Sequence, residues 1–158
     1  MAVAELGFYR LTETPLDRAL PVMLAKSLER GWRVEVRGRD RAAMEALDLS
    51  LWSHDQAGFL PHGLAGGPQD ARQPVLLTTE PTPAGGPREA LFLIDRAAFD
   101  TGEAASLTRT ALLFDGHDDE ALEEARAHWR ATTAAGLRAV FWSQAPGGRW
   151  EKQAESGG

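Results

Sequence analysis

The fold is decided by residues 5–37, which read ELGFYRLTETPLDRALPVMLAKSLERGWRVEVR. The short apolar stretch at 5–11 predicts a strand. Apolar residues then recur at 16–28 with the spacing of one helical face, and Gly31 ends that helix. At 32–37 apolar and charged residues alternate, which predicts a half-buried second strand. The order strand, helix, strand is typical of the start of an α/β fold.

Strands and helices continue to alternate along the rest of the chain, with no internal repeat and no linker between domains. We therefore expect a single three-layer α/β domain over residues 1–142, with a mostly parallel or mixed sheet and helices on both faces. Residues 143–158 lack an apolar period and are expected to form a mobile tail. The further predicted elements are a helix capped by Asp40, a loop at 58–68, strands at 74–79 and 90–94, a strand at 107–114 or a helical turn near Glu103, a helix that begins at Asp118 or Asp119 and ends at Gly136, and a strand at 137–142.

The composition excludes several classes of protein and of site. The chain has 158 residues and no cysteine, so it has no disulfide, thiol nucleophile or cysteine-bound metal. It shows no secretory signal and no apolar run of membrane-spanning length, so we expect a cytoplasmic protein without a membrane partner.

The charge is negative and unevenly distributed. The chain has 17 basic and 23 acidic side chains, a net charge of −6, which argues against extensive phosphate contact. We therefore expect no direct binding to nucleic acid. Six carboxylates lie within 115–124. A basic group consists of Arg30, Arg33, Arg37, Arg39 and Arg41.

The sequence carries no motif for catalysis, a cofactor or a metal. The turn at 11–15 has no glycine and holds a carboxylate where a pyrophosphate would need bare backbone N–H groups. No G-x-S-x-G elbow occurs. Glu124 and His128 share a predicted helical face, but such a pair is more often a solvated ion pair than a metal site. We predict no catalytic residue, no cofactor and no metal. The alternative is a small-ligand or nucleotide-binding protein on a Rossmann-like sheet that uses the 58–68 loop.

Two segments have the side chains of a partner-binding site. The loop at 51–66 contains Trp52, Phe59, Pro61 and His62 where a simple connection would be polar. These side chains either form a pocket for an apolar group of a partner or pack into the core.

The second segment lies in the last predicted helix. Arg126 and Arg130 are four residues apart on one helical face, with Trp129 beside them. Their guanidinium groups either bind a partner's carboxylate with paired hydrogen bonds or, for Arg126, pair with Glu123 inside the helix.

The loop also carries the most specific family resemblance. The sequence resembles the chi subunit of bacterial DNA polymerase III, an accessory protein of the clamp loader, in Leu51-Trp52 and in Phe59-Leu60-Pro61-His62-Gly63-Leu64-Ala65-Gly66. Supporting similarity over residues 5–142 comes from the Phe8-Tyr9 strand, the 25–37 segment, and the Arg126, Trp129 and Ala135-Gly136 pattern.

The resemblance implies a Rossmann-like fold without a phosphate loop and without catalytic activity. It also implies a replication adaptor that binds the acidic, Phe-terminated C-terminal tail of single-stranded-DNA-binding protein. The adaptor would link that protein to the clamp loader, in some bacteria through a psi subunit. Arg126 and Trp129 would bind the end of the tail, Arg130 its aspartates, and the loop would shape a neighbouring pocket. The tail-binding residues implied by the resemblance are Arg126, Trp129, Arg130, Trp52, Phe59, Pro61 and His62.

Overall fold

The secondary structure alternates between strands and helices, as expected. It comes from a computed structural model that describes residues 4–53, 61–66, 70–80 and 88–157. The elements in chain order are β1 (Glu5–Leu11), α1 (Leu16–Glu29), β2 (Val34–Arg37), α2 (Arg41–Ser53), β3 (His62–Leu64), the 3-10 helix η1 (Asp70–Arg72), β4 (Val75–Thr78), β5 (Ala90–Leu93), α3 (Thr101–Ala105), β6 (Arg109–Asp115), α4 (Asp119–Ala134), β7 (Arg138–Gln144) and β8 (Trp150–Ser156).

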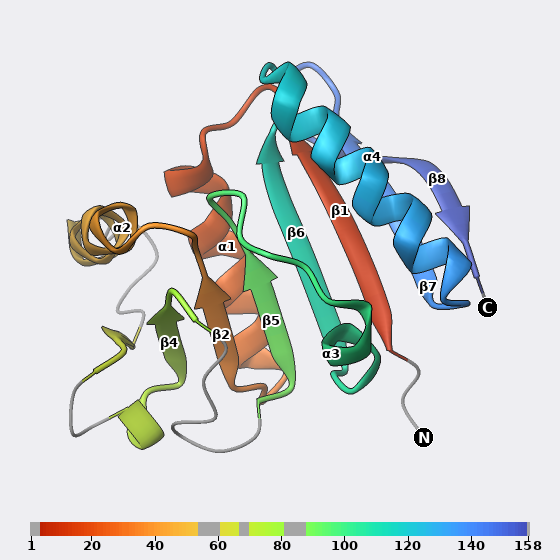
Figure 1. Cartoon of the computed structure of the whole chain (residues 1–158). Coiled ribbons are helices and arrows are strands. Elements are labelled where there is room, and N and C mark those ends of the chain that lie inside the picture. The colour runs from red at the N-terminus through yellow and green to blue at the C-terminus, as the bar shows by residue number, and fades with distance from the viewer. Residues whose placement is uncertain (1–3, 54–60, 67–69, 81–87, 158) are drawn as a thin grey trace.

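The described strands form one eight-stranded sheet in the order β3-β4-β2-β5-β6-β1-β7-β8 (Figure 1). Neighbouring strands are parallel except β7 and β8, which are antiparallel. The prediction of a mostly parallel or mixed sheet is therefore confirmed. The chain leaves β1 through α1 toward one end of the sheet and leaves β6 through α4 toward the other.

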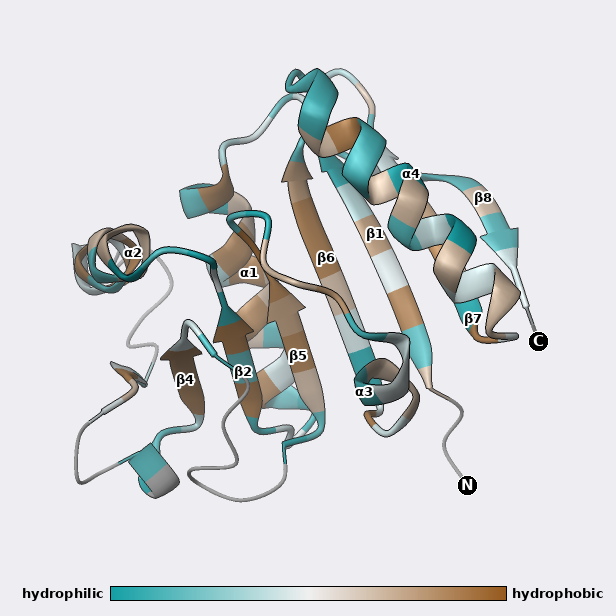
Figure 2. Cartoon of the chain, in the orientation of Figure 1, coloured by the Kyte–Doolittle hydropathy of each residue, from teal (hydrophilic) through white to brown (hydrophobic). Residues whose placement is uncertain are grey.

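Helices cover both faces of the sheet, which confirms the three layers. On one face α1 and α2 pack over a core in which Leu20, Leu24 and Met44 are fully buried. On the other face α3 and α4 pack around Phe8. Figure 2 shows that β4, β5 and β6 are largely hydrophobic, whereas β8 and much of α4 are hydrophilic. The two cores therefore lie against the middle of the sheet.

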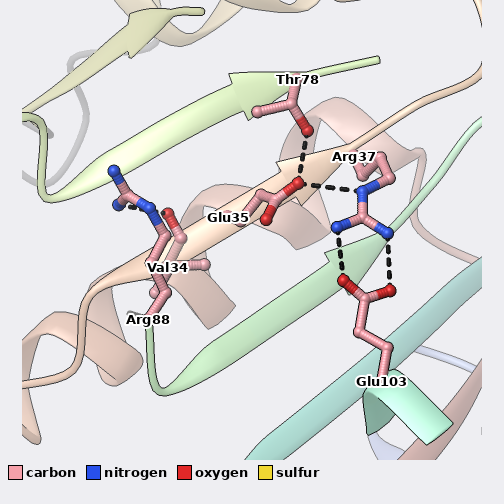
Figure 3. A network of polar contacts seen from close by, with 6 residues as sticks. All are labelled: Val34, Glu35, Arg37, Thr78, Arg88 and Glu103. Carbon is pink, nitrogen blue, oxygen red and sulfur yellow. Dashed lines mark hydrogen bonds and ion pairs between the residues drawn. The ribbon is translucent and has the colours of Figure 1, made fainter. Parts of the chain in front are cut away.

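Strand β2 differs from the predicted half-buried strand, because all four of its residues are buried between β4 and β5. Its charged side chains form an internal network (Figure 3). Arg37 donates from Nε to Glu35 at 2.9 Å and from its two terminal nitrogens to Glu103 of α3 at 2.8 and 2.7 Å. The hydroxyl of Thr78 donates to Glu35 at 2.7 Å. Because these charges are satisfied inside the protein, Arg37 is no part of a surface basic group.

Residues 150–156 form strand β8, which corrects the expectation of a tail without regular structure. β8 pairs with β7, with Ala154 opposite Phe141 and Trp150 opposite Gln144. The sequence missed this strand because its pairing depends on backbone hydrogen bonds while most of its side chains are exposed. Its Lys and Glu side chains suit an outer strand, which charged residues protect from pairing with other chains.

Candidate functional site

Helix α4 carries one of the two expected groups of site residues. Of the two candidate caps, Asp118 is the one used: its carboxylate accepts hydrogen bonds from two backbone N–H groups of the first turn at 3.0 and 3.3 Å. The helix ends before Gly136, whose φ of 76° is the left-handed conformation that glycine favours. Between these ends the helix presents Arg126, Trp129 and Arg130.

Trp129 lies at the rim of the core on the α4 face. Its ring meets Phe8 edge-on at 5.5 Å and Phe141 at 5.9 Å. The side chain is partly buried, so packing holds the ring in place while part of it faces solvent. A fixed aromatic surface therefore lies beside Arg126 and Arg130.

The two arginines are exposed on the outside of α4. Arg126 is 55% exposed and contacts Glu123 at 3.3 Å, so the intrahelical pair considered from the sequence is present. Exposed pairs of this kind contribute about 0–1 kcal/mol, which leaves the Arg126 guanidinium free to exchange partners. Arg130 is exposed one turn later and forms no ion pair within the described ranges. Both guanidinium groups can form paired hydrogen bonds to a carboxylate.

The carboxylates at the start of α4 are partly neutralised by Arg96. Its guanidinium donates to Glu124 from Nε at 2.8 Å and contacts Glu120 at 3.3 Å. The hydrogen bond from Arg96 lowers the pKa of Glu124. Burial lowers the pKa of His128, whose ring lies 5.0 Å from that of Phe99. Within the part of the chain that the structure describes, no three metal-ligating side chains gather in one place.

The second expected group lies at the far edge of the sheet, on α2 and β3. His62 is buried, with Nε2 3.2 Å from the Oδ1 atom of Asp48. The ring of Trp52 lies 4.4 Å from the His62 ring and is 50% exposed, so this aromatic is only partly core. Pro61 is half-buried directly before β3. Phe59 lies outside the described residues.

The described members of the two groups do not share a pocket. β3 is the outermost strand at one end of the sheet, whereas α4 packs against β6, β1 and β7 toward the other end. α2 and α4 also lie on opposite faces of the sheet (Figure 1). The structure therefore brings together Arg126, Trp129 and Arg130, and separately Trp52, Pro61 and His62.

The turn between β1 and α1 is where a Rossmann-like protein would bind a nucleotide phosphate. The backbone N–H groups of Thr12, Glu13 and Thr14 converge there and all donate to Oε1 of Gln144, at 3.0–3.1 Å. The Gln144 amide also donates to the Thr14 hydroxyl at 2.9 Å, and α1 has Pro15 as its N-cap without a side-chain cap. A side chain of the protein thus takes the position of an anion, which disfavours the nucleotide-binding alternative.

Comparison with protein families then identifies the chain. A model of the family described as DNA polymerase III chi subunit, HolC, matches residues 3–139. The chain belongs to the chi subunit family. Chi subunits are part of DNA polymerase III and act in DNA replication. Comparison with curated proteins gives no match.

The match to the chi family covers both groups of candidate residues but ends inside β7, at residue 139. Gln144 and strand β8 therefore lie beyond the matched residues. One signal in the sequence could have pointed to a residue such as Gln144. Three successive backbone N–H groups at the turn before α1 require a hydrogen-bond acceptor, which Gln144 supplies. None of the described helices of this chi subunit is long and apolar enough to cross a membrane.

Proposed function

We propose that this chi subunit is a non-catalytic adaptor of the replisome. It binds the acidic, Phe-terminated C-terminal tail of single-stranded-DNA-binding protein and links that protein to the clamp loader. The observation that carries the proposal is the exposed pair of guanidinium groups of Arg126 and Arg130 beside the fixed ring of Trp129.

The three side chains match the three kinds of group in such a tail. Arg126 binds the terminal α-carboxylate with two parallel hydrogen bonds, and a hydrogen bond between charged groups contributes about 1.5–3 kcal/mol. The terminal phenyl ring packs on Trp129, and burial of a phenylalanine contributes about 1.5–3 kcal/mol. Arg130 attracts the aspartates that precede the terminal residue.

The carboxylates of α4 weaken this attraction without removing it. Glu124 is hydrogen-bonded to Arg96, so its charge is compensated. Glu123 competes directly for Arg126, but their exposed contact at 3.3 Å is easily replaced by a better aligned carboxylate.

An adaptor also needs a second surface, and α2 supplies a candidate at the opposite end of the sheet. Leu49 is 68% exposed and Trp52 is 50% exposed, and their separation of three residues places them on one side of the helix. Exposed apolar side chains of this size favour a protein partner. This surface would face the clamp loader. In bacteria that have a psi subunit, the contact would be made through that subunit.

Titration calorimetry with a peptide copying the C-terminus of the organism's own single-stranded-DNA-binding protein tests the proposal. We expect binding by the native peptide and much weaker binding by the same peptide amidated at its C-terminus. Arg126→Ala should weaken binding, whereas the matched variant Arg72→Ala, exposed in η1, should not.

Two results would contradict the proposal. One is that the native peptide gives no heat of binding in the calorimeter at any concentration that can be reached. The other is a thermal stabilisation of the chain by nucleotides but not by the peptide, which would favour the small-ligand alternative.

A further inference from the structure

A groove of about 590 Å³ runs along α1, on the face of the sheet opposite to α4. On this face the sheet extends past α1 into β1, β7 and β8 (Figure 1). We call this groove the α1 groove. The side chains that determine its chemistry are Arg18, Lys26, Arg30, Tyr9, Trp32 and Trp142.

The α1 groove is cationic although the whole chain carries −6. The described residues that line it include four cationic side chains and no carboxylate. Arg18, Lys26 and Arg30 follow one stripe of α1 and its C-cap, so they span about 18 Å at 1.5 Å per residue. Within the described ranges these three form no ion pair, whereas Arg109 is paired with Glu5 at 3.0 Å.

Aromatic rings form the floor of the α1 groove. Tyr9 on β1 and Trp142 on β7 lie parallel, with an angle of 7° between their planes and 6.4 Å between their centres. Trp150 on β8 meets Tyr9 edge-on at 5.3 Å. The Tyr9 ring lies across Gly7, where a Cβ atom would come within 2.5 Å of it. The absence of a side chain at Gly7 therefore allows the ring to lie on the backbone of its own strand.

A further aromatic ring lies beside the cationic stripe. The Arg30 guanidinium is 5.0 Å from the centre of the Trp32 ring, and that of Arg109 is 5.7 Å from it. Cations and rings thus occur together along the α1 groove. This combination, a cationic track beside stacking surfaces, is the one used by proteins that bind single strands without sequence preference.

We infer that the α1 groove binds single-stranded nucleic acid, with the phosphates along Arg18, Lys26 and Arg30 and the bases against Tyr9 and Trp142. An acidic peptide would satisfy the cations, but it would leave most of the rings uncovered, whereas successive bases can stack on several of them. Net charge led us to expect no such contact. That expectation treats the charge as uniform, and the structure separates the carboxylates of α4 from the cations of α1 by the thickness of the sheet.

Fluorescence anisotropy of a labelled oligothymidylate, titrated with the full chain over a series of salt concentrations, tests this inference. Three cations without an ion pair among the described residues predict a slope of log K against log salt of about −2, so binding should be measurable at low salt and weak at physiological salt. Arg18→Gln with Lys26→Gln should bring the slope to about −0.7. Arg39→Gln with Arg72→Gln, which changes the net charge equally at exposed positions outside the groove, should leave it near −2.

The aromatic contribution is tested with Trp142→Leu. We expect at least about fivefold weaker binding with an unchanged salt slope, because stacking is lost while phosphate contacts remain. Photochemical crosslinking of an iodouracil-substituted oligonucleotide should label peptides that contain Tyr9 or Trp142. Thermal unfolding of each variant verifies that the fold is retained.

Three results would overturn the inference. The first is no oligonucleotide binding at low salt. The second is a decrease of the salt slope in the Arg39 and Arg72 variant that equals the decrease in the Arg18 and Lys26 variant. The third is loss of tail-peptide binding, without loss of oligonucleotide binding, in the Arg18 and Lys26 variant, which would make the groove a peptide site. A tail peptide that binds nowhere would contradict the proposed adaptor function alone and leave the oligonucleotide results standing.

Discussion

The centre of the sheet and the outer surface of α4 each place an arginine beside glutamates, with opposite consequences. Arg37 is 4% exposed, and three of its nitrogens donate to two carboxylates at 2.7–2.9 Å. Arg126 is 55% exposed and contacts one carboxylate at 3.3 Å. The Arg37 guanidinium is held by hydrogen bonds inside the protein, whereas the Arg126 guanidinium can bind a partner with little loss of folding stability.

The two surroundings also differ in what a lost partner would leave behind. Burial lowers the pKa of Arg37, but the hydrogen bonds to Glu103 and Glu35 outweigh burial, and the net pKa is raised. The guanidinium therefore stays charged inside the protein, and its removal would strand Glu35 as an uncompensated buried charge. Removal of Arg126 would leave Glu123 in water, where its charge is well solvated.

The largest effect that we predict is on stability and comes from Arg37→Met. Breaking a buried pair by removing one partner costs about 3–5 kcal/mol, so the free energy of unfolding in urea should fall by that amount. Arg126→Met is the matched variant and should change stability by less than about 0.5 kcal/mol. Equal urea midpoints for the two variants would show that burial does not distinguish these arginines.

The next effect concerns the outer strand. A chain that ends at Gly148 lacks β8 and with it the ring of Trp150, which packs against Tyr9 at 5.3 Å. We expect a loss of about 1.5–3 kcal/mol in the free energy of unfolding, the range for burial of one large apolar side chain. Trp150→Ala in the full chain separates the lost ring from the lost strand pairing. A truncated chain as stable as the full one would return residues 150–156 to the role of a dispensable tail.

The third effect is on binding and leaves the fold unchanged. Arg126→Ala should weaken binding of the acidic, Phe-terminated tail by at least about 1.5–3 kcal/mol, the contribution of one hydrogen bond between charged groups, because it removes the paired hydrogen bonds to the terminal carboxylate. Amidation of the peptide removes the other half of the same contact. The two changes together should therefore cost little more than either one alone. Full additivity of the two losses would place the terminal carboxylate elsewhere on the chain.

Sequence reasoning succeeded where the deciding interactions are local. The spacing of apolar residues predicted β1, α1, β2, β4, β5 and β7 in their correct order, although the short strand β3 lies where a loop was expected. The polar residues before the last helix predicted a cap, which the structure assigns to Asp118. The placement of Arg126 and Arg130 along one side of that helix follows from the same periodicity.

Sequence reasoning failed where contacts join distant parts of the chain. The alternation in β2 correctly predicted two faces, but whether the charged face meets water depends on Thr78 and Glu103, far along the chain. β8 depends on pairing with β7, and the β1–α1 turn depends on Gln144. The resemblance implied that the loop shapes a pocket next to the α4 residues, whereas Trp52, Pro61 and His62 lie at the other end of the sheet from α4. A family resemblance gives residues without the distances between them.

The smallest effect tests whether Glu123, on the same helix, competes with a partner for the exposed Arg126. Glu123→Gln removes the carboxylate that contacts Arg126 and leaves the side chain nearly the same size. Since exposed pairs within a helix contribute about 0.3–0.5 kcal/mol, tail affinity should rise by that amount, roughly twofold. Glu45→Gln is the matched control, because it breaks a similar exposed pair, with Arg41 at 3.6 Å on α2, and changes the net charge equally. An equal gain from both variants, measured by titration at one salt concentration, would mean that the tail responds to the overall negative charge. A gain from Glu123→Gln alone would mean that Glu123 competes with the tail for Arg126 itself.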